Sequence, residues 1–63
     1  MTFYVLAVYD RKNHVIRKTG FRELYRAFKE YNNCRESQKT LIEQTYIYRK
    51  TDPVNEKIIA IQY

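Results

Sequence analysis

The stretch Thr2–Tyr9, with the sequence TFYVLAVY, is rich in aromatic and β-branched residues and is short. These properties predict a β-strand. Both alternating sets of side chains in it are apolar, so such a strand is either covered on two faces or lies centrally with a partner chain against one face. The remainder of the chain, or a partner chain for one face, therefore has to cover this strand on both sides.

A hairpin is predicted to follow this strand. Residues 10–13, Asp-Arg-Lys-Asn, favour a turn, because Asp and Asn bond locally to the backbone and Asn tolerates left-handed geometry. Residues 14–18, His-Val-Ile-Arg-Lys, then return as a second, shorter strand.

A helix is predicted from Thr19 or Gly20 to Tyr31 or Asn32. Thr19 is a good N-cap, and Glu23 would lie in the first turn, where the helix dipole favours an acid. Two consecutive asparagines then stop the helix, since Asn tolerates the left-handed conformation of a C-cap. The side chains at the spacing of one helix face form a stripe wide enough to cover a sheet: Phe21, Leu24, Tyr25, Phe28 and Tyr31.

The second half of the chain predicts another hairpin. Residues 34–40 are polar and favour a loop or a further helical turn. A strand is predicted over 41–49, strongest at 45–48, followed by a loop at 51–56 that holds the single proline. Residues 57–63 predict a closing strand whose apolar residues again face both sides.

The predicted order is β-β-α-β-β in one domain covering residues 1–63. Because consecutive strands usually pair, we predict an α+β fold with a four-stranded antiparallel sheet and one helix packed on one face. A single helix covers only one side of such a sheet, yet residues 3–9 and 58–61 are apolar on both sides. A second copy that stacks on the sheet or extends it would resolve this excess.

The length of the chain also favours self-association. With 63 residues, the chain buries only about 60% of the surface that its unfolded form exposes. Cys34 is the only cysteine, which excludes an intramolecular disulfide, and His14 is the only histidine, so a four-ligand structural zinc site is excluded too. We therefore expect a homodimer.

The charge balance of the chain narrows the classes of partner. Twelve Lys and Arg against seven Asp and Glu give a net charge of +5, which favours nucleic acid, an anionic membrane surface or an acidic protein. The longest apolar run is far too short for a transmembrane span, and no basic segment precedes it as in a signal peptide. We expect a cytoplasmic protein without a membrane partner.

No catalytic, metal-binding or cofactor-binding residues are predicted. Nothing in the sequence brings Cys34 and His14 together as a nucleophile and its base. The acidic residues are scattered singly among basic neighbours, and a single glycine cannot build a phosphate-binding loop. We therefore expect a protein that is not an enzyme and uses no cofactor.

One flank of the predicted helix carries the most specific surface pattern. At 100° per residue, Arg22, Arg26 and Lys29 cluster beside Tyr25, while Arg26 and Glu30 have the spacing of a surface ion pair. A basic stripe of this kind can bind a phosphate backbone. It is also what an ordinary solvated helix face looks like, and both interpretations stay open.

The tyrosines form a second pattern, with seven in the chain and no tryptophan. Tyr46 and Tyr48 are predicted to point to one face of their strand, along with Ile42 and Lys50, and Arg49 adjoins them. Such residues stack unpaired bases in RNA-binding modules, anchor protein interfaces, or wall the core with their hydroxyls in water; we favour a core or dimer interface. Basic pairs also recur along the chain, either on one rim of the sheet or as protection of strand ends: Arg11-Lys12, Arg17-Lys18 and Arg49-Lys50.

The length and the richness in lysine, asparagine, isoleucine and tyrosine resemble those of short accessory proteins of phages and mobile elements in AT-rich bacteria. This resemblance implies a modulator of a host protein. We therefore predict a small binding module, homodimeric and acting through protein–protein contact. The alternative is a protein that binds DNA or RNA with the basic helix flank and exposed tyrosines. The candidate surface in either case comprises Arg22, Tyr25, Arg26, Lys29, Tyr46, Tyr48, Arg49 and Lys50.

Overall fold

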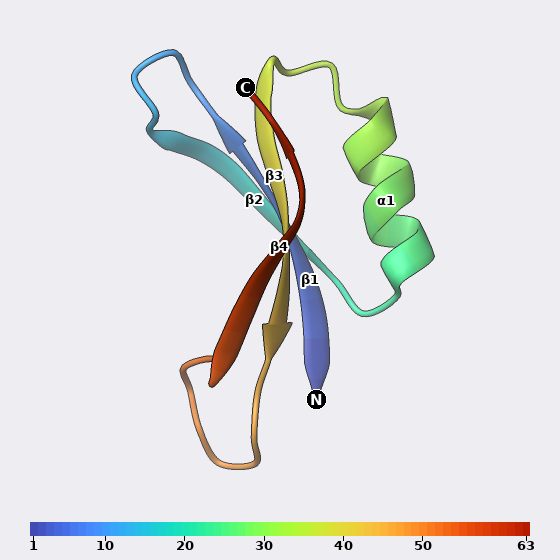
Figure 1. Ribbon diagram of the computed structural model, residues 1–63, viewed down its shortest axis with the longest axis vertical. Helices are drawn as coiled ribbons and strands as arrows, with labels where there is room; N and C mark the ends of the chain where they lie inside the picture. The colour runs from blue at the N-terminus through green and yellow to red at the C-terminus, as the bar shows by residue number, and fades with distance from the viewer.

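The computed structural model describes all residues, 1–63, and has the predicted order of elements. The elements are β1 (Thr2–Tyr9), β2 (Val15–Phe21), α1 (Leu24–Asn33), β3 (Gln38–Thr45) and β4 (Asn55–Gln62). The strands form one antiparallel sheet in the order β2-β1-β3-β4, and α1 lies along one side of it (Figure 1). The predicted α+β fold is therefore confirmed. The two-sided apolar strand β1 is a central strand, whereas β2 and β4 are the edges.

The register of β4 is set by an irregularity in its pairing with β3. Ile42 pairs with Ile58 and Thr40 pairs with Ile61, so Ile59 is an extra residue between these pairs. Cross-strand partners share a face of the sheet, and residues two apart on a regular strand do too. Because of this bulge, Ile58 and Ile61 point to the same face although they are three residues apart.

The hydrophobic core lies between α1 and the sheet. Its buried members come from β1, β3 and the helix: Leu6, Val8, Leu41, Ala27 and Tyr31. Partly buried side chains from β2, from the ends of the helix and from β4 pack around them, among them Phe21, Phe28, Cys34 and Ile59. Only 8 of the 63 residues are buried, so this core is small. Six of the eight lie on the helix side, whereas Ala7 and Thr40 are buried on the opposite side of the sheet.

A buried lysine holds the carboxyl end of α1 against the sheet. Lys39 of β3 is only 5% exposed, and its Nζ donates to the carbonyl oxygens of Tyr31 at 2.6 Å and Cys34 at 2.8 Å. The ammonium also lies 4.5 Å from the centroid of the Tyr31 ring. A charge can be buried when hydrogen bonds replace its lost hydration, and the last carbonyls of a helix need donors. Lys39 satisfies both requirements at once.

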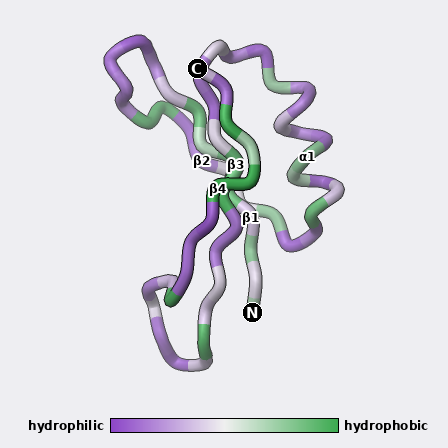
Figure 2. The backbone as a smooth tube through the Cα atoms, viewed as in Figure 1, coloured by the Kyte–Doolittle hydropathy of each residue, from purple (hydrophilic) through white to green (hydrophobic).

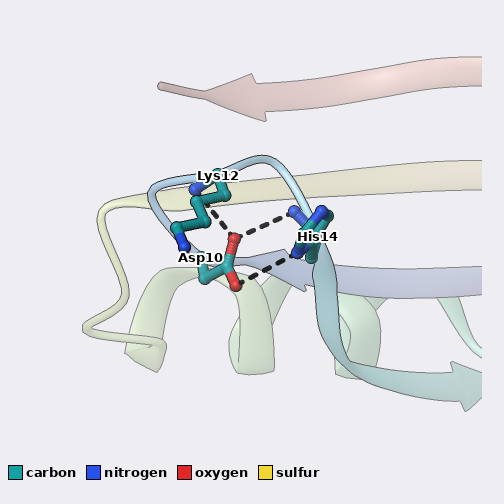
Figure 3. A network of polar contacts seen from close by, with 3 residues as sticks. All are labelled: Asp10, Lys12 and His14. Atoms are coloured by element: carbon teal, nitrogen blue, oxygen red, sulfur yellow. Dashed lines mark hydrogen bonds and ion pairs between the residues drawn. The ribbon is translucent and has the colours of Figure 1, made fainter.

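The β1–β2 turn closes around one carboxylate, as predicted for this segment. Asp10 Oδ1 accepts hydrogen bonds from the backbone N–H groups of Lys12 and His14, both at 2.9 Å, and Oδ2 lies 3.8 Å from His14 Nδ1 (Figure 3). Asn13 adopts a φ of 65°, the left-handed conformation that asparagine tolerates. Local side-chain bonding and the backbone freedom of asparagine therefore build this turn.

The predicted start of the helix is wrong. Thr19 and Gly20 belong to β2, and the helix begins at Leu24, with Glu23 as an N-cap that makes no side-chain capping bond. The register explains the difference, because β2 continues pairing with β1 as far as Phe21, opposite Tyr4. Pairing with a central strand overrides the local capping signal of Thr19.

The predicted helix stripe and the predicted stop also need correction. Leu24 is 41% and Tyr25 67% exposed, whereas the unpredicted Ala27 is fully buried and packs next to the sheet. The helix does end close to the predicted place, at Asn33, but no asparagine there is left-handed. Its C-cap is Cys34 in an extended conformation. The Tyr31 carbonyl accepts hydrogen bonds from the Cys34 N–H and from Lys39 Nζ, which also donates to the Cys34 carbonyl.

The third strand begins and ends earlier in the chain than the predicted range 41–49. β3 spans Gln38–Thr45, so the polar residues before 41 are partly strand and the tyrosines after 45 are not. β3 pairs with β1 from Tyr9 opposite Gln38 to Thr2 opposite Thr45. At Tyr46 the pairing continues for one more residue, since the backbones of Met1 and Tyr46 exchange hydrogen bonds at 2.9 and 2.7 Å. The rest of residues 46–54 forms the loop to β4.

Candidate functional site

The side of the sheet opposite α1, called the open face below, is the largest surface without a cover. Cross-strand pairing fixes which side chains point to it. The central strands contribute Phe3, Val5, Ala7, Tyr9, Gln38, Thr40, Ile42 and Gln44, and β4 contributes Glu56, Ile58 and Ile61. From β2, Val15, Lys18 and Gly20 face the same side. Lys18 and Glu56 are therefore the only charged side chains that the register assigns to this face.

Apolar groups on the open face surround a shallow hollow of about 360 Å³. Its walls include Tyr9, Ile42, Ile58, Ile61 and the terminal Tyr63. Ile58 is 57% and Ile61 46% exposed, so both keep much of their apolar surface in water. The middle of the strands is hydrophobic while the tip of the β1–β2 hairpin is hydrophilic (Figure 2). The hollow reaches from Ile42 and Ile58 in the middle of the strands to Asn13 in the β1–β2 turn.

One polar atom in this hollow has an unmet hydrogen-bonding capacity. Gln38, at the β3 end opposite Tyr9, lines the hollow, and its Oε1 is buried and accepts no hydrogen bond. At the other end of β3, Gln44 on the same face is satisfied, since its Nε2 donates to Glu56 Oε1 at 2.8 Å and its Oε1 accepts from the Tyr46 hydroxyl at 2.9 Å. The open face therefore combines apolar contact area with one buried amide oxygen that has no partner within the chain.

Nothing on the open face resembles a reaction centre. No three His, Cys, Asp or Glu side chains gather where they could hold a metal ion. His14 faces Asp10 in the hairpin turn, and Cys34 Sγ accepts a long hydrogen bond from Arg17 Nη2 at 3.7 Å. No helix of the chain is long and apolar enough to cross a membrane. What the surface offers is contact through apolar and amide groups.

The predicted helix flank is brought together in part. Tyr25, Arg26 and Lys29 line one hollow of about 330 Å³ beside α1, together with Glu30 and with Phe21 of β2. Arg26 pairs with Glu23, with its Nε 3.7 Å from Glu23 Oε2, rather than with Glu30 as the spacing predicted. The two cations of the flank, Arg26 and Lys29, are thus balanced by two acidic side chains, Glu23 and Glu30.

Arg22 does not belong to this flank. It precedes the helix, and its Cζ lies 5.8 Å from the centroid of the Phe3 ring, which belongs to the open face. The Phe3 ring in turn makes an edge-to-face contact with Tyr46, with centroids 5.7 Å apart. Arg22 and Tyr46 therefore border the open face at the amino end of β1.

The predicted pairing of Tyr46 and Tyr48 on one strand face is wrong, because both lie in the loop after β3. Tyr46 is half-buried against Phe3, whereas Tyr48 is exposed and lies 5.3 Å from Arg49 Cζ. Arg49 adopts a φ of 68°, and Lys50 N–H donates to the Ile47 carbonyl, so this part of the loop is a tight turn. Tyr48, Arg49 and Lys50 form a small basic tip at the far end of the hairpin.

The basic pairs do not follow one rim of the sheet. Arg11-Lys12 follows the carboxyl end of β1, whereas Arg49-Lys50 follows β3, whose end pairs with the start of β1. These pairs lie at opposite ends of the molecule, and the helix flank lies on a third side (Figure 1). The positive charge is dispersed instead of forming one continuous basic surface.

No protein-family model, curated protein or solved structure matches the chain. The residues that sequence reasoning left out of the site are Tyr9, Gln38, Ile42, Ile58 and Ile61, although the two-sided apolar pattern of residues 3–9 and 58–61 indicated such a face. The bulge that places Ile58 and Ile61 together left no signal in the sequence.

Proposed function

We propose that this chain is a small binding module that self-associates and acts through protein–protein contact at the open face of its sheet. The observation that carries the proposal is the apolar open face, with exposed Ile58 and Ile61 around a hollow, in a chain of net charge +5. The register assigns one cation and one anion to that face, so its own charges balance. Contiguous apolar patches are rare on monomeric proteins and mark interaction sites.

The same surface favours a protein partner over a polyanion. Affinity for nucleic acid comes mainly from cations placed along the phosphate backbone, and the open face offers Lys18 with Arg22 at its border for this purpose. Apolar side chains with amides and tyrosines at the margin are typical of protein interfaces. A module without chemistry of its own acts by occupying a surface of its partner, which fits the proposed role as modulator of a host protein.

A photo-crosslinking amino acid placed at Ile58 tests the open face as the protein-binding surface. The matched control carries the same group at Arg26, on the outside of α1, where the side chain is also exposed. Irradiation in cells that naturally express the chain should give protein adducts from position 58 and few from position 26. Equal adducts from both positions, or protein adducts from 26 alone, would contradict the proposal.

The second candidate function is nucleic-acid binding by the helix flank, favoured by the joint placement of Tyr25, Arg26 and Lys29 in one hollow. Fluorescence anisotropy with mixed DNA and RNA oligonucleotides at low and physiological salt tests it. Phosphate contacts strengthen steeply as salt falls, so binding should appear first at low salt. The variant R26A/K29A should then lose it while R49A/K50A, at the loop tip, should keep it. Absence of binding at low salt excludes this function.

A further inference from the structure

The two edge strands of the sheet, β2 and β4, differ in whether their middle residues are charged. β2 carries Arg17 and Lys18 in its middle, and charged residues on an edge strand oppose pairing with another strand. β4, the other edge, has an uncharged middle, Ile58–Ile61, and no element of the chain covers its outer side. An uncovered apolar edge presents free backbone N–H and C=O groups to any strand that can match it.

We propose that two copies of this chain pair through their β4 strands, antiparallel and about a two-fold axis between Ile59 and Ala60. This proposal rests on the self-association proposed above. It adds which surface the two copies share and in which register their β4 strands pair. It joins two sheets edge to edge into one continuous sheet with a helix on the same side of each half. A two-fold axis is the commonest symmetry of small oligomers, and it requires one self-complementary surface.

The bulge in β4 selects this register. Paired residues on neighbouring strands must point to the same face of the sheet. Ile58 and Ile61 point to the open face, whereas Ile59 and Ala60 pack against the helix-side core. With the axis between residues 59 and 60, Ile58 lies opposite Ile61 of the partner subunit and Ile59 opposite Ala60 of the partner subunit. A shift of one or two residues in either direction opposes an open-face residue to a helix-side residue.

The ends of β4 fit the same register. Lys57 pairs with Glu43 and Gln62 pairs with Lys39, so both point to the helix side. In the dimer, Lys57 lies opposite Gln62 of the partner subunit. Glu56, on the open face, lies opposite Tyr63 of the partner subunit. No two like charges are directly opposed, which such cross-strand pairing requires for stability.

The dimer also enlarges the surface that binds a protein. With strands about 4.8 Å apart and about 3.4 Å per residue, one open face measures roughly 500 Å² in projection, whereas a standard protein interface uses about 800 Å² from each partner. Two faces joined at β4 supply roughly 1,000 Å². Ile58 and Ile61, which line the hollow of each subunit, then lie at the seam. The complete binding surface is therefore a property of the dimer.

A double cysteine variant tests the register of the β4 pairing directly. We would replace Lys57 and Gln62 by cysteine in a C34S background, which removes the only native thiol. Within one strand these positions are about 17 Å apart and cannot bond to each other. Across the proposed interface they are directly opposed, with Cα atoms about 4.5–5.5 Å apart, within the range of a disulfide. Mild oxidation should give a covalent dimer held by two disulfides.

The matched control is E56C/Q62C in the same background. Both positions are exposed, but they point to opposite faces of the sheet in the proposed register. K57C/Q62C should oxidise to dimer roughly tenfold or more faster than this control, since the proposed pairing raises the effective concentration of its thiols. Sedimentation velocity on the reduced variants and the unaltered chain measures association independently of the disulfides.

The outcomes separate this inference from the proposed function. A dimer in solution whose K57C/Q62C variant oxidises fast supports β4 pairing. A dimer in which both variants oxidise equally slowly overturns this interface but leaves self-association standing. A chain that stays monomeric at all concentrations overturns the β4 dimer and the self-association on which it rests, whereas photo-crosslinking at Ile58 still decides whether the open face binds a protein.

Discussion

The two faces of this sheet carry similar apolar side chains and differ in what lies over them. On the helix side Leu41 is 0% exposed, enclosed by α1 and its neighbours. On the open side Ile58 and Ile61, from the adjacent strand, remain about half exposed. The sheet is thus built to be covered twice, and one chain of this length supplies a single helix. This difference between the faces is the reason why we propose the open face as the binding surface.

Two adjacent residues of β3 show the same contrast for polar groups. Lys39 points to the helix side, where its buried ammonium donates to two carbonyls. Gln38 points to the open side, where its buried Oε1 accepts nothing. A buried polar group stabilises a fold when it is paired and destabilises it when it is not. The helix side is therefore complete within one chain, and the open side is not.

The largest expected effect comes from removing matched aliphatic groups on the two faces. L41A should lower the free energy of unfolding by about 3–4 kcal/mol, because a fully buried leucine leaves a cavity. I42A, the next residue on the half-buried open side, should cost at most about 1.5 kcal/mol. Urea denaturation at low micromolar concentration measures both. Equal losses would mean that the open face is as well packed as the core.

The next effect concerns the buried lysine. K39A should cost about 2 kcal/mol, since the carbonyls of Tyr31 and Cys34 lose a charged donor. K39M, which keeps the apolar stem, should recover part of that loss, and K29M on the exposed side of α1 should change stability by less than about 0.5 kcal/mol. Thermal unfolding followed by circular dichroism separates these variants. A stability of K39A equal to that of K29M would show that Lys39 does not hold the helix end.

The sequence predicted the order of elements and the first hairpin, because both follow from local patterns. The alternation of residues 2–9 and the turn chemistry of Asp10 and Asn13 act within a few residues of each other. The helix start failed because Phe21 pairs with Tyr4, a contact that no local pattern encodes. The third strand was displaced because its bounds depend on the length of β1, to which it pairs.

The candidate site was predicted less well, for a similar reason. Residue type alone favours tyrosines and arginines as binding residues, and it gives no reason to select the isoleucines of β4. Tyr25, Arg26 and Lys29 do share one surface, because helical spacing alone places them there. Tyr46 and Tyr48 do not, since their placement depends on where β3 ends. The open face itself follows from register and from one bulge, which are tertiary properties.

The smallest predicted effect distinguishes the two glutamines that β3 presents to the open face. Q38M should raise the free energy of unfolding by about 1 kcal/mol, because it removes a buried acceptor that has no partner. Q44M should lower it by a similar amount, about 1 kcal/mol, since Gln44 bonds to both Glu56 and Tyr46. Urea denaturation of the pair at one protein concentration is the measurement.

The deciding result is that the free energy of unfolding changes in opposite directions for Q38M and Q44M, because the two substitutions remove the same amide group from the same strand and face. Loss of stability in both variants would show that Gln38 is satisfied within the chain, and the open face would then lack its unpartnered amide oxygen. If Q38M gains stability, the crosslinking yield from Ile58 to a protein partner should fall in that background when the partner donates to Oε1. A stabilised chain that binds less well would identify Gln38 as a group retained for contact at the cost of fold stability.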